Sequence, residues 1–192
     1  MIVLGSASPR RKELFEKLGI PFVVAVVDVD ESIDDTVPFP HAAQTVAMRK
    51  VKAARLAYPN PRDCVITADT IVIIDSAIVG KPVDYEDAYR ILSILSGRRH
   101  SVITGVCIDY DHTLHVFSEE TRVHFSVLSK KDITEYLMKN DYSDKAGAYG
   151  IQGNARFFVE KIIGDYYNVV GFPMNRFLRE FRTVFGKDVT EL

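Results

Sequence analysis

Hydrophobic residues occur along the chain in short runs of two kinds that alternate from one end to the other. Segments with apolar residues every three or four positions predict helices, and dense, β-branched or alternating runs predict strands. The predicted strands cover residues 2–4, 22–27, 64–75, 77–79, 99–110, 114–127, 157–163 and 166–170. Because helices and strands interleave throughout, we expect an α/β fold with a mixed sheet flanked by helices.

Capping residues locate the ends of the predicted helices. Ser8 followed by Pro9 is typical of a helix start, and Gly19 of a helix end. Asp84 and Ser129 are expected to cap two further helices in the same way. The helices predicted from these signals and from apolar periodicity cover residues 8–19, 41–58, 84–97, 129 onward and 173–186.

Composition limits the classes of protein that the chain can belong to. With 192 residues and 47% hydrophobic residues, it can form a single domain over residues 1–192, built as two lobes that share one sheet with a central cleft for a ligand. A net charge of −2 argues against nucleic-acid and anionic-membrane binding. No apolar run could span a bilayer and no signal peptide is visible, so a cytoplasmic protein is expected. Cys64 and Cys107 lie in apolar runs, which is typical of buried thiols.

The first candidate site is the start of the first helix. Ser6 and Ser8 precede three consecutive cations, Arg10, Arg11 and Lys12. Cations are disfavoured in a first helical turn by about 0.3–1 kcal/mol each, and free N–H groups at that end attract anions. The pattern therefore favours a phosphate site slightly over a solvated turn.

The second candidate is Asp69, a carboxylate within the most apolar strand of the chain. Burying it is costly unless it is paired, binds a metal or acts as a general base. A structural carboxylate at a strand end, hydrogen-bonded to backbone, is an equally good interpretation. Glu31, in an acidic stretch, could supply a second metal ligand, although such stretches are mostly solvated loops.

Three weaker signals follow along the chain. The turn at residues 80–82 presents Lys81, and Lys52 lies on a helix rich in cations; both are more commonly solvent-facing. Gln152 lies near the end of a loop of glycines and small residues at 146–153, and its amide could read a base edge. An ordinary connector would have the same composition.

Taken in order, these segments resemble the Maf family, also called septum-formation inhibitor proteins. The matching segments are residues 6–11, Glu31, Lys52, 68–70, 80–82, 96–97, 146–153 and 166–173. The resemblance covers essentially the whole chain. Phe172, where leucine is usual, and the loop at 37–40 depart from the family pattern without touching a motif position.

The resemblance implies a fold similar to inosine triphosphate pyrophosphatase and hydrolysis of a nucleoside triphosphate to monophosphate and pyrophosphate. Arg10, Thr70 and Gln152 match the branch that acts on dTTP and UTP, rather than the branch that acts on 7-methyl-GTP. The resemblance also implies Mg²⁺ or Mn²⁺ as cofactor, and a homodimer, since the family often forms dimers.

These implications give a specific set of site residues. Asp69 and Glu31 would hold the metal, Asp69 would accept the proton of the attacking water, and Lys52 and Lys81 would neutralise phosphates. Ser6, Ser8, Arg10, Arg11, Thr70 and Gln152 would bind the substrate. The main alternative is a non-enzymatic regulator of septum formation that acts through a protein partner, which would not need these charges.

Overall fold

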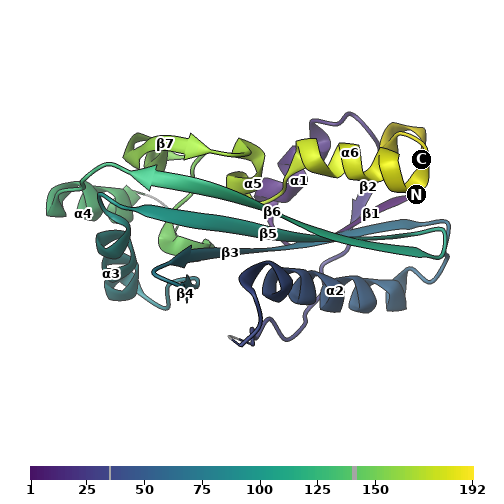
Figure 1. The fold of residues 1–192 in the computed structure, drawn as a ribbon, viewed down its shortest axis with the longest axis horizontal. Helices are drawn as coiled ribbons and strands as arrows, with labels where there is room; N and C mark the ends of the chain where they lie inside the picture. Colours follow the sequence, from purple (N-terminus) through teal and green to yellow (C-terminus); the bar gives the residue numbers. More distant parts are fainter. Residues whose placement is uncertain (35, 140–141) are drawn as a thin grey trace. The chain divides into compact units, whose positions relative to one another are not determined.

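The structure is a computed structural model that describes residues 1–34, 36–139 and 142–192. Across these residues the strands form a seven-stranded mixed sheet in the order β2-β1-β3-β5-β6-β7, with β4 paired to β3 (Figure 1). The pairs β1–β2 and β1–β3 are parallel, whereas β3–β4 and β6–β7 are antiparallel. This arrangement confirms the α/β class and the mixed sheet.

The elements have the following bounds. The strands are β1 (Ile2–Gly5), β2 (Phe22–Val24), β3 (Cys64–Ile74), β4 (Ala77–Val79), β5 (Arg99–Tyr110), β6 (Thr113–Phe125) and β7 (Val159–Ile163). The α-helices are α1 (Pro9–Glu16), α2 (Phe39–Ala57), α3 (Tyr85–Leu95), α4 (Lys130–Lys139), α5 (Tyr166–Val170) and α6 (Met174–Phe185). Three short 3₁₀ helices are η1 (Ala146–Ala148), η2 (Asn154–Phe158) and η3 (Val189–Glu191).

The chain forms two compact units, each made of several segments. Unit 1 comprises Met1–Thr70, Thr104–Glu119 and Gly171–Leu192, and unit 2 comprises Ile71–Ile103 and Glu120–Val170. Strands β3, β5 and β6 therefore each contribute residues to both units. That a single domain covers residues 1–192 stays a prediction.

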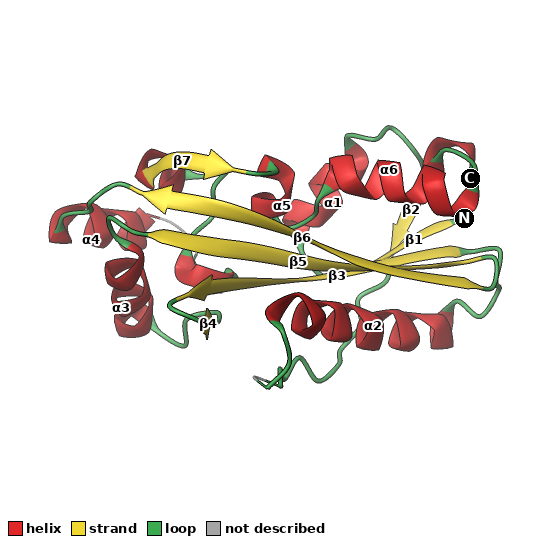
Figure 2. Ribbon diagram, in the orientation of Figure 1, coloured by secondary structure: helices red, strands yellow, loops and turns green. Residues whose placement is uncertain are grey.

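In unit 1, helices cover both faces of the strands, with α2 on one face and α1 and α6 on the other (Figure 2). Val3 of β1 belongs to the same buried cluster as Ala47, Val51 and Ala54 of α2. Helix α2 approaches β5 so closely that a Cβ on Gly105 would lie 2.4 Å from the carbonyl carbon of Ala43. Glycine is thus required at this contact, which fixes the height of α2 above the sheet.

Aromatic rings pack together on the face of unit 1 that α1 and α6 cover. Phe15 of α1 meets Phe172 at 5.0 Å and Phe177 of α6 at 5.8 Å between ring centroids. All three side chains are fully buried. This contact attaches the C-terminal helix to α1 and so supports the helix whose start is the predicted phosphate site.

In unit 2, α3 packs against α4 and η1. The N-caps predicted for these helices are present: the backbone N–H of Asp87 donates to Asp84 Oδ1, and that of Asp132 to Ser129 Oγ. Gly97 follows α3 with a φ of 68°, as expected of a helix end. The hairpin between β5 and β6 turns in unit 1, at Asp111 and His112, both with positive φ.

One element of the sequence prediction is wrong. Residues 166–170 form helix α5 instead of a strand. Asp165 lies just before this helix and its Oδ1 accepts the N–H of Tyr167, which favours a helical turn. The buried Asn168 side chain donates to Val102 O and Thr121 Oγ1, so polar contacts hold a segment whose apolar residues are typical of a strand.

The strand predicted for residues 157–163 begins later, because η2 takes its first two residues and β7 starts at Val159. Both cysteines are buried and free, as predicted, and burial raises the pKa of each thiol to about 12. Among the described residues, no helix combines the length and the apolar character that crossing a membrane requires.

Candidate functional site

The start of α1 is organised by the two serines that precede it. Ser8 is the N-cap, and its Oγ accepts the backbone N–H of Arg11 at 3.5 Å. Ser6 Oγ accepts the backbone N–H of Ser8 at 3.2 Å. Pro9 occupies the first turn of the helix, where its missing N–H costs nothing. Both serines therefore shape the helix start at which a phosphate is expected.

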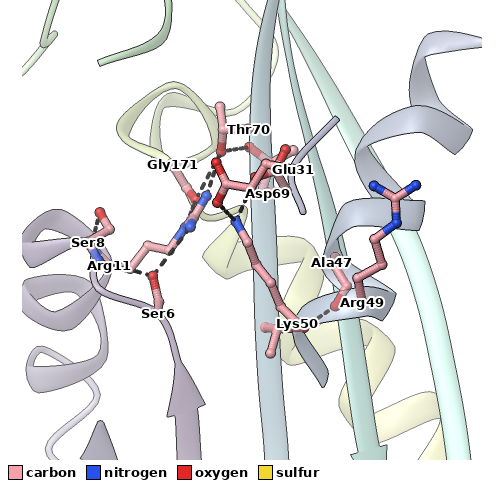
Figure 3. A network of polar contacts seen from close by, with 12 residues as sticks. Ser6, Ser8, Arg11, Glu31, Ala47, Arg49, Lys50, Asp69, Thr70 and Gly171 are labelled. Atoms are coloured by element: carbon pink, nitrogen blue, oxygen red, sulfur yellow. Dashed lines mark hydrogen bonds and ion pairs between the residues drawn. The ribbon is translucent and has the colours of Figure 1, made fainter. Parts of the chain in front are cut away.

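Arg11 is buried at the centre of this region, with only 8% of its surface exposed. Its guanidinium donates to Gly171 O at 2.8 Å, Ser6 Oγ at 3.3 Å and Thr70 Oγ1 at 2.9 Å (Figure 3). All three acceptors are neutral, and no carboxylate forms an ion pair with Arg11 within the part of the chain that is described. Burial lowers the pKa of Arg11, opposed by the negative charge of Asp69. A buried cation without a paired anion is suited to binding one.

Gly171 and Thr70 are held in place to receive Arg11. Gly171 has a φ of 127°, which L-residues rarely adopt, and this backbone directs its carbonyl at Arg11. Thr70 Oγ1 also lies 2.9 Å from Thr104 Oγ1 on β5. The hydroxyl of Thr70 is thus already engaged by Arg11 and Thr104.

The second part of the site joins two carboxylates to one ammonium. Lys50 Nζ lies 2.8 Å from Asp69 Oδ1 and 2.7 Å from Glu31 Oε1. Lys50 is 8% exposed, the Asp69 side chain 13% and the Glu31 side chain 47%. Figure 3 shows the three side chains pointing toward one another from α2, β3 and the loop after β2. Asp69 is therefore paired with Lys50, and together with Glu31 it makes a cation-binding arrangement.

Several contacts hold this group in position. Arg49 donates to the backbone carbonyls of Asp30 and Ser32, which fastens the acidic loop to α2 on either side of Glu31. Thr67 Oγ1, two residues before Asp69, donates to Ala47 O at 2.6 Å. The strand that carries Asp69 and the helix that carries Lys50 are thus tied together one turn from the ion pair.

Lys52, which the sequence predicted for this site, is not part of the group. Two residues along an α-helix correspond to a rotation of about 200°, so Lys50 and Lys52 point in nearly opposite directions. Lys50 lies on the buried stripe with Ala47 and Ala54, whereas Lys52 is exposed. The lysine that contacts the two carboxylates is therefore Lys50. A role of Lys52 at the phosphates stays a prediction.

Two further predicted residues, Lys81 and Gln152, belong to unit 2. Lys81 is exposed in the turn after β4, and Gly147 N donates to Gly80 O at 3.0 Å beside it. Gln152 borders a surface pocket of about 460 Å³ with Arg156, Lys161 and Tyr166. Lys81 and Gln152 thus lie on two loops, residues 80–82 and 146–153, which the hydrogen bond between Gly147 and Gly80 joins.

The loop at residues 146–153 contains backbone strain at two consecutive residues. Gly147 and Ala148 have φ values of 73° and 58°. A left-handed conformation costs a non-glycine residue about 1–3 kcal/mol and persists only where the surroundings enforce it. Ala148 is fully buried, so the conformation of the loop is fixed by packing.

Comparison with known proteins identifies the family. A family model described as "Maf-like protein" matches residues 1–184. This chain belongs to the Maf family. A protein of Symbiobacterium thermophilum named "dTTP/UTP pyrophosphatase" is 44% identical over 185 residues, covering 96% of this chain and 94% of that protein. A protein of the same name from Geobacillus sp. is 43% identical over 181 residues, covering 94% and 96%.

Among solved structures, a nucleoside-triphosphatase (dITP/XTP pyrophosphatase) from Mycobacterium abscessus aligns with 66% of this chain and 75% of its own. The alignment has a TM-score of 0.41 and 14% sequence identity.

The donor set of this Maf chain limits how it could bind a divalent cation. Asp69 and Glu31 supply hard carboxylate oxygens, which suit Mg²⁺ and Mn²⁺, and both already contact one positive charge. Within the described residues, no group of three or more potential protein ligands is present. Mg²⁺ commonly uses one or two carboxylates with substrate phosphates and water, so the residues fit a cation that arrives with a nucleotide.

Three residues of the Maf site were missed by sequence reasoning. Lys50 could have been found from helical periodicity, because it continues the apolar stripe that contains Ala43, Ala47 and Ala54. Thr104 and the carbonyl of Gly171 could not, because each reaches the site only through tertiary contacts with residues far away in the sequence.

Proposed function

We propose that this Maf protein hydrolyses dTTP and UTP between the α- and β-phosphates, giving the nucleoside monophosphate and pyrophosphate. Two relatives that match nearly the whole chain have the name dTTP/UTP pyrophosphatase. The observation that carries the proposal is the group of Asp69, Glu31 and Lys50, with the unpaired cation of Arg11 in the same unit. Paired carboxylates and buried cations together suit the hydrolysis of a phosphoanhydride.

The start of α1 is proposed to bind the phosphates. Its N-terminal N–H groups and the guanidinium of Arg11 supply hydrogen-bond donors, and Arg10 adds a second, partly exposed cation. Ser6 and Ser8 set the geometry of this turn. Lys81 is proposed as a further phosphate ligand. Phosphoryl transfer depends mainly on positioning and charge neutralisation, which these residues would provide.

Asp69 is proposed to accept the proton of the attacking water. Its carboxylate is held by Lys50 Nζ at 2.8 Å, which leaves Oδ2 as the oxygen directed away from that bond. A carboxylate fixed in the middle of a strand, as Asp69 is in β3, can hold a water in one orientation. Lys50 would thus position Asp69 and Glu31, and would keep the two negative charges close together.

A divalent cation is proposed as cofactor, held by Asp69 and Glu31 and by oxygens of the substrate. When bound, such a cation would polarise the phosphate and lower the pKa of its water. The protein itself would contribute the two carboxylates and the ammonium that balances them in the absence of substrate.

Gln152 is proposed to read the pyrimidine, because an amide both donates and accepts hydrogen bonds. A contact between Thr70 and the base also stays a prediction. The hydroxyl of Thr70 is occupied by Arg11 and Thr104, so we propose that its main contribution is to hold Arg11.

The test is product analysis with a panel of nucleoside triphosphates in Mg²⁺ or Mn²⁺. The proposal predicts pyrophosphate and monophosphate as products, with dTTP and UTP the preferred substrates. Release of single phosphates would contradict cleavage between the α- and β-phosphates, and a preference for purines would contradict the assigned branch.

A further inference from the structure

Three polar contacts fasten residues 146–153, which we call the Gln152 loop. Gly147 N donates to Gly80 O at 3.0 Å, and Gly150 N donates to Tyr136 Oη at 3.3 Å. The third contact joins side chains: Tyr149 Oη lies 2.8 Å from Nε2 of His100 on β5. Because Tyr149 is three residues from Gln152, this bond acts close to the amide that is proposed to read the base.

His100 and Tyr149 are buried together with a third ring. His100 is 3% exposed, and its ring meets Phe125 of β6 edge-to-face at 5.0 Å. Tyr149 meets Phe125 at 4.8 Å and His100 at 5.5 Å between centroids. The three rings form one cluster, so a rotation of any one of them would disturb the loop.

A histidine at this position is costly for stability. Phenylalanine would preserve the ring contacts, whereas His100 buries two ring nitrogens, of which Nδ1 has no hydrogen-bond partner among the residues described. Burial lowers the pKa of His100 to about 4, so the ring is neutral near pH 7. Packing alone therefore does not explain why position 100 is a histidine. What histidine provides and phenylalanine cannot is the hydrogen bond to Tyr149.

The strained backbone next to Tyr149 also indicates that the hydrogen bond to His100 serves the loop conformation. Ala148, directly before Tyr149, has a φ of 58°, and such strain is retained only where surrounding contacts enforce it. A buried, directional hydrogen bond admits fewer arrangements than a purely apolar contact does. The bond between His100 and Tyr149 thus selects one conformation of the strained loop.

We propose that His100 is a positioning residue for nucleotide selection, which acts through its hydrogen bond to Tyr149 to hold the Gln152 loop in the conformation that reads the base. This inference rests on the proposed function. His100 is not proposed to contact the substrate. Its effect on the reaction passes through Tyr149 and the loop, whereas the groups assigned to the chemistry, Asp69 and Lys50, belong to unit 1.

The experiment compares His100→Phe, Tyr149→Phe and His100→Gln with Gln152→Ala. The first two variants remove the hydrogen bond from either side and keep an aromatic ring, and His100→Gln keeps a polar nitrogen in place of Nε2. His115→Phe is the matched control, since it replaces a half-buried histidine of unit 1 that contacts Glu180 at 2.9 Å.

We expect the KM for dTTP to rise about tenfold in His100→Phe and Tyr149→Phe, with kcat changed less than about threefold. The preference for dTTP over GTP should fall as it does in Gln152→Ala. His100→Gln should recover part of this preference, and His115→Phe should retain it. A lower melting temperature in His100→Phe with unchanged KM and preference would overturn the proposal, because that result describes a purely structural residue.

Amide hydrogen exchange tests the same inference without any turnover. In His100→Phe, the N–H groups of Gly147 and Gly150 should exchange at least about tenfold faster than in the wild type, while amides of α2 keep their rates. Equal exchange at both glycines would overturn the positioning role. If the wild type cleaved neither dTTP nor UTP, the proposed function would fail, and the exchange rates would still decide whether His100 holds the loop.

Discussion

Two lysines on α2 that are only two residues apart have different surroundings. Lys50 continues the buried stripe of the helix and its ammonium binds Asp69 and Glu31, whereas Lys52 is exposed. Burying a lysine is costly unless its charge is matched, and two carboxylates match it here. The position of Lys50 is thus explained by the site and not by the core around it.

The first prediction compares Lys50→Met with Lys52→Met. Methionine has a similar length without the charge, so Lys50→Met removes the ammonium and leaves Asp69 and Glu31 to repel each other. We expect kcat/KM for dTTP to fall about 100-fold in Lys50→Met, the scale of a lost electrostatic contact in an active site. Steady-state kinetics measures this loss, and Lys52→Met, which removes an exposed charge outside the group, should lose much less. Equal losses in both variants would argue against the assignment of Lys50.

At the scale of elements, close packing of α2 on the sheet holds this ion pair together. Gly105 of β5 lies directly beneath the backbone of Ala43, and Thr67 of β3 donates to Ala47 O. Both contacts involve the helix backbone, so they set the height of α2 and the depth of Lys50. The site thus depends on contacts that contain no catalytic group.

The second prediction concerns Gly105→Ala. The added Cβ would lie 2.4 Å from Ala43 C, and backbone atoms must move to admit it. We expect the free energy of unfolding to fall by about 2 kcal/mol, as in overpacked cores, and activity to fall because α2 is displaced. Urea denaturation provides the measurement. Gly80→Ala is the control for stability, since nothing lies within 4 Å of a Cβ there and the residue has no positive φ. Similar stabilities of the two variants would refute the close contact.

The elements that could be predicted from sequence are those with strong local signals. Helix α1 begins at Pro9 after its Ser8 cap, and α3 follows its Asp84 cap, because capping depends on a few neighbouring residues. Helix α5 was missed because its apolar residues suit a strand, while Asn168 is held by tertiary hydrogen bonds. The charged motifs of the site could be identified in the sequence. Which lysine contacts the carboxylates could not, because it depends on which face of α2 packs against the sheet.

At the scale of the whole molecule, the buried ring of His100 makes the free energy of unfolding depend on pH. Burial lowers the pKa of His100 from 6.5 to about 4. Below pH 6.5 the unfolded chain binds a proton here that the folded chain does not, so acid favours unfolding. Stability from this group is therefore full above pH 6.5 and decreases as the pH falls toward 4.

The third prediction follows from this shift. Between pH 7 and pH 5, His100 should remove about 2 kcal/mol from the free energy of unfolding. His100→Phe lacks the titrating group, so its stability should depend less on pH by that amount over the same interval. Urea denaturation of both proteins at the two pH values measures the difference. Parallel pH dependences of the wild type and the variant would contradict a neutral buried histidine.

The proposed turnover depends on one carboxylate, that of Asp69, in a protein that stays folded when the carboxylate is replaced. Asp69→Asn keeps the shape of the side chain and can still accept a hydrogen bond from Lys50, but cannot take a proton from water. Asp28→Asn removes the same charge from the exposed acidic stretch and serves as the control.

The most direct measurement is therefore pyrophosphate release from dTTP with Mg²⁺ or Mn²⁺ by the wild type, Asp69→Asn and Asp28→Asn, each with its melting temperature. We expect an active wild type, an Asp28→Asn variant close to it, and a folded Asp69→Asn variant at least about 1,000-fold slower. A folded Asp69→Asn variant with activity near that of the wild type would contradict the role of Asp69 as proton acceptor.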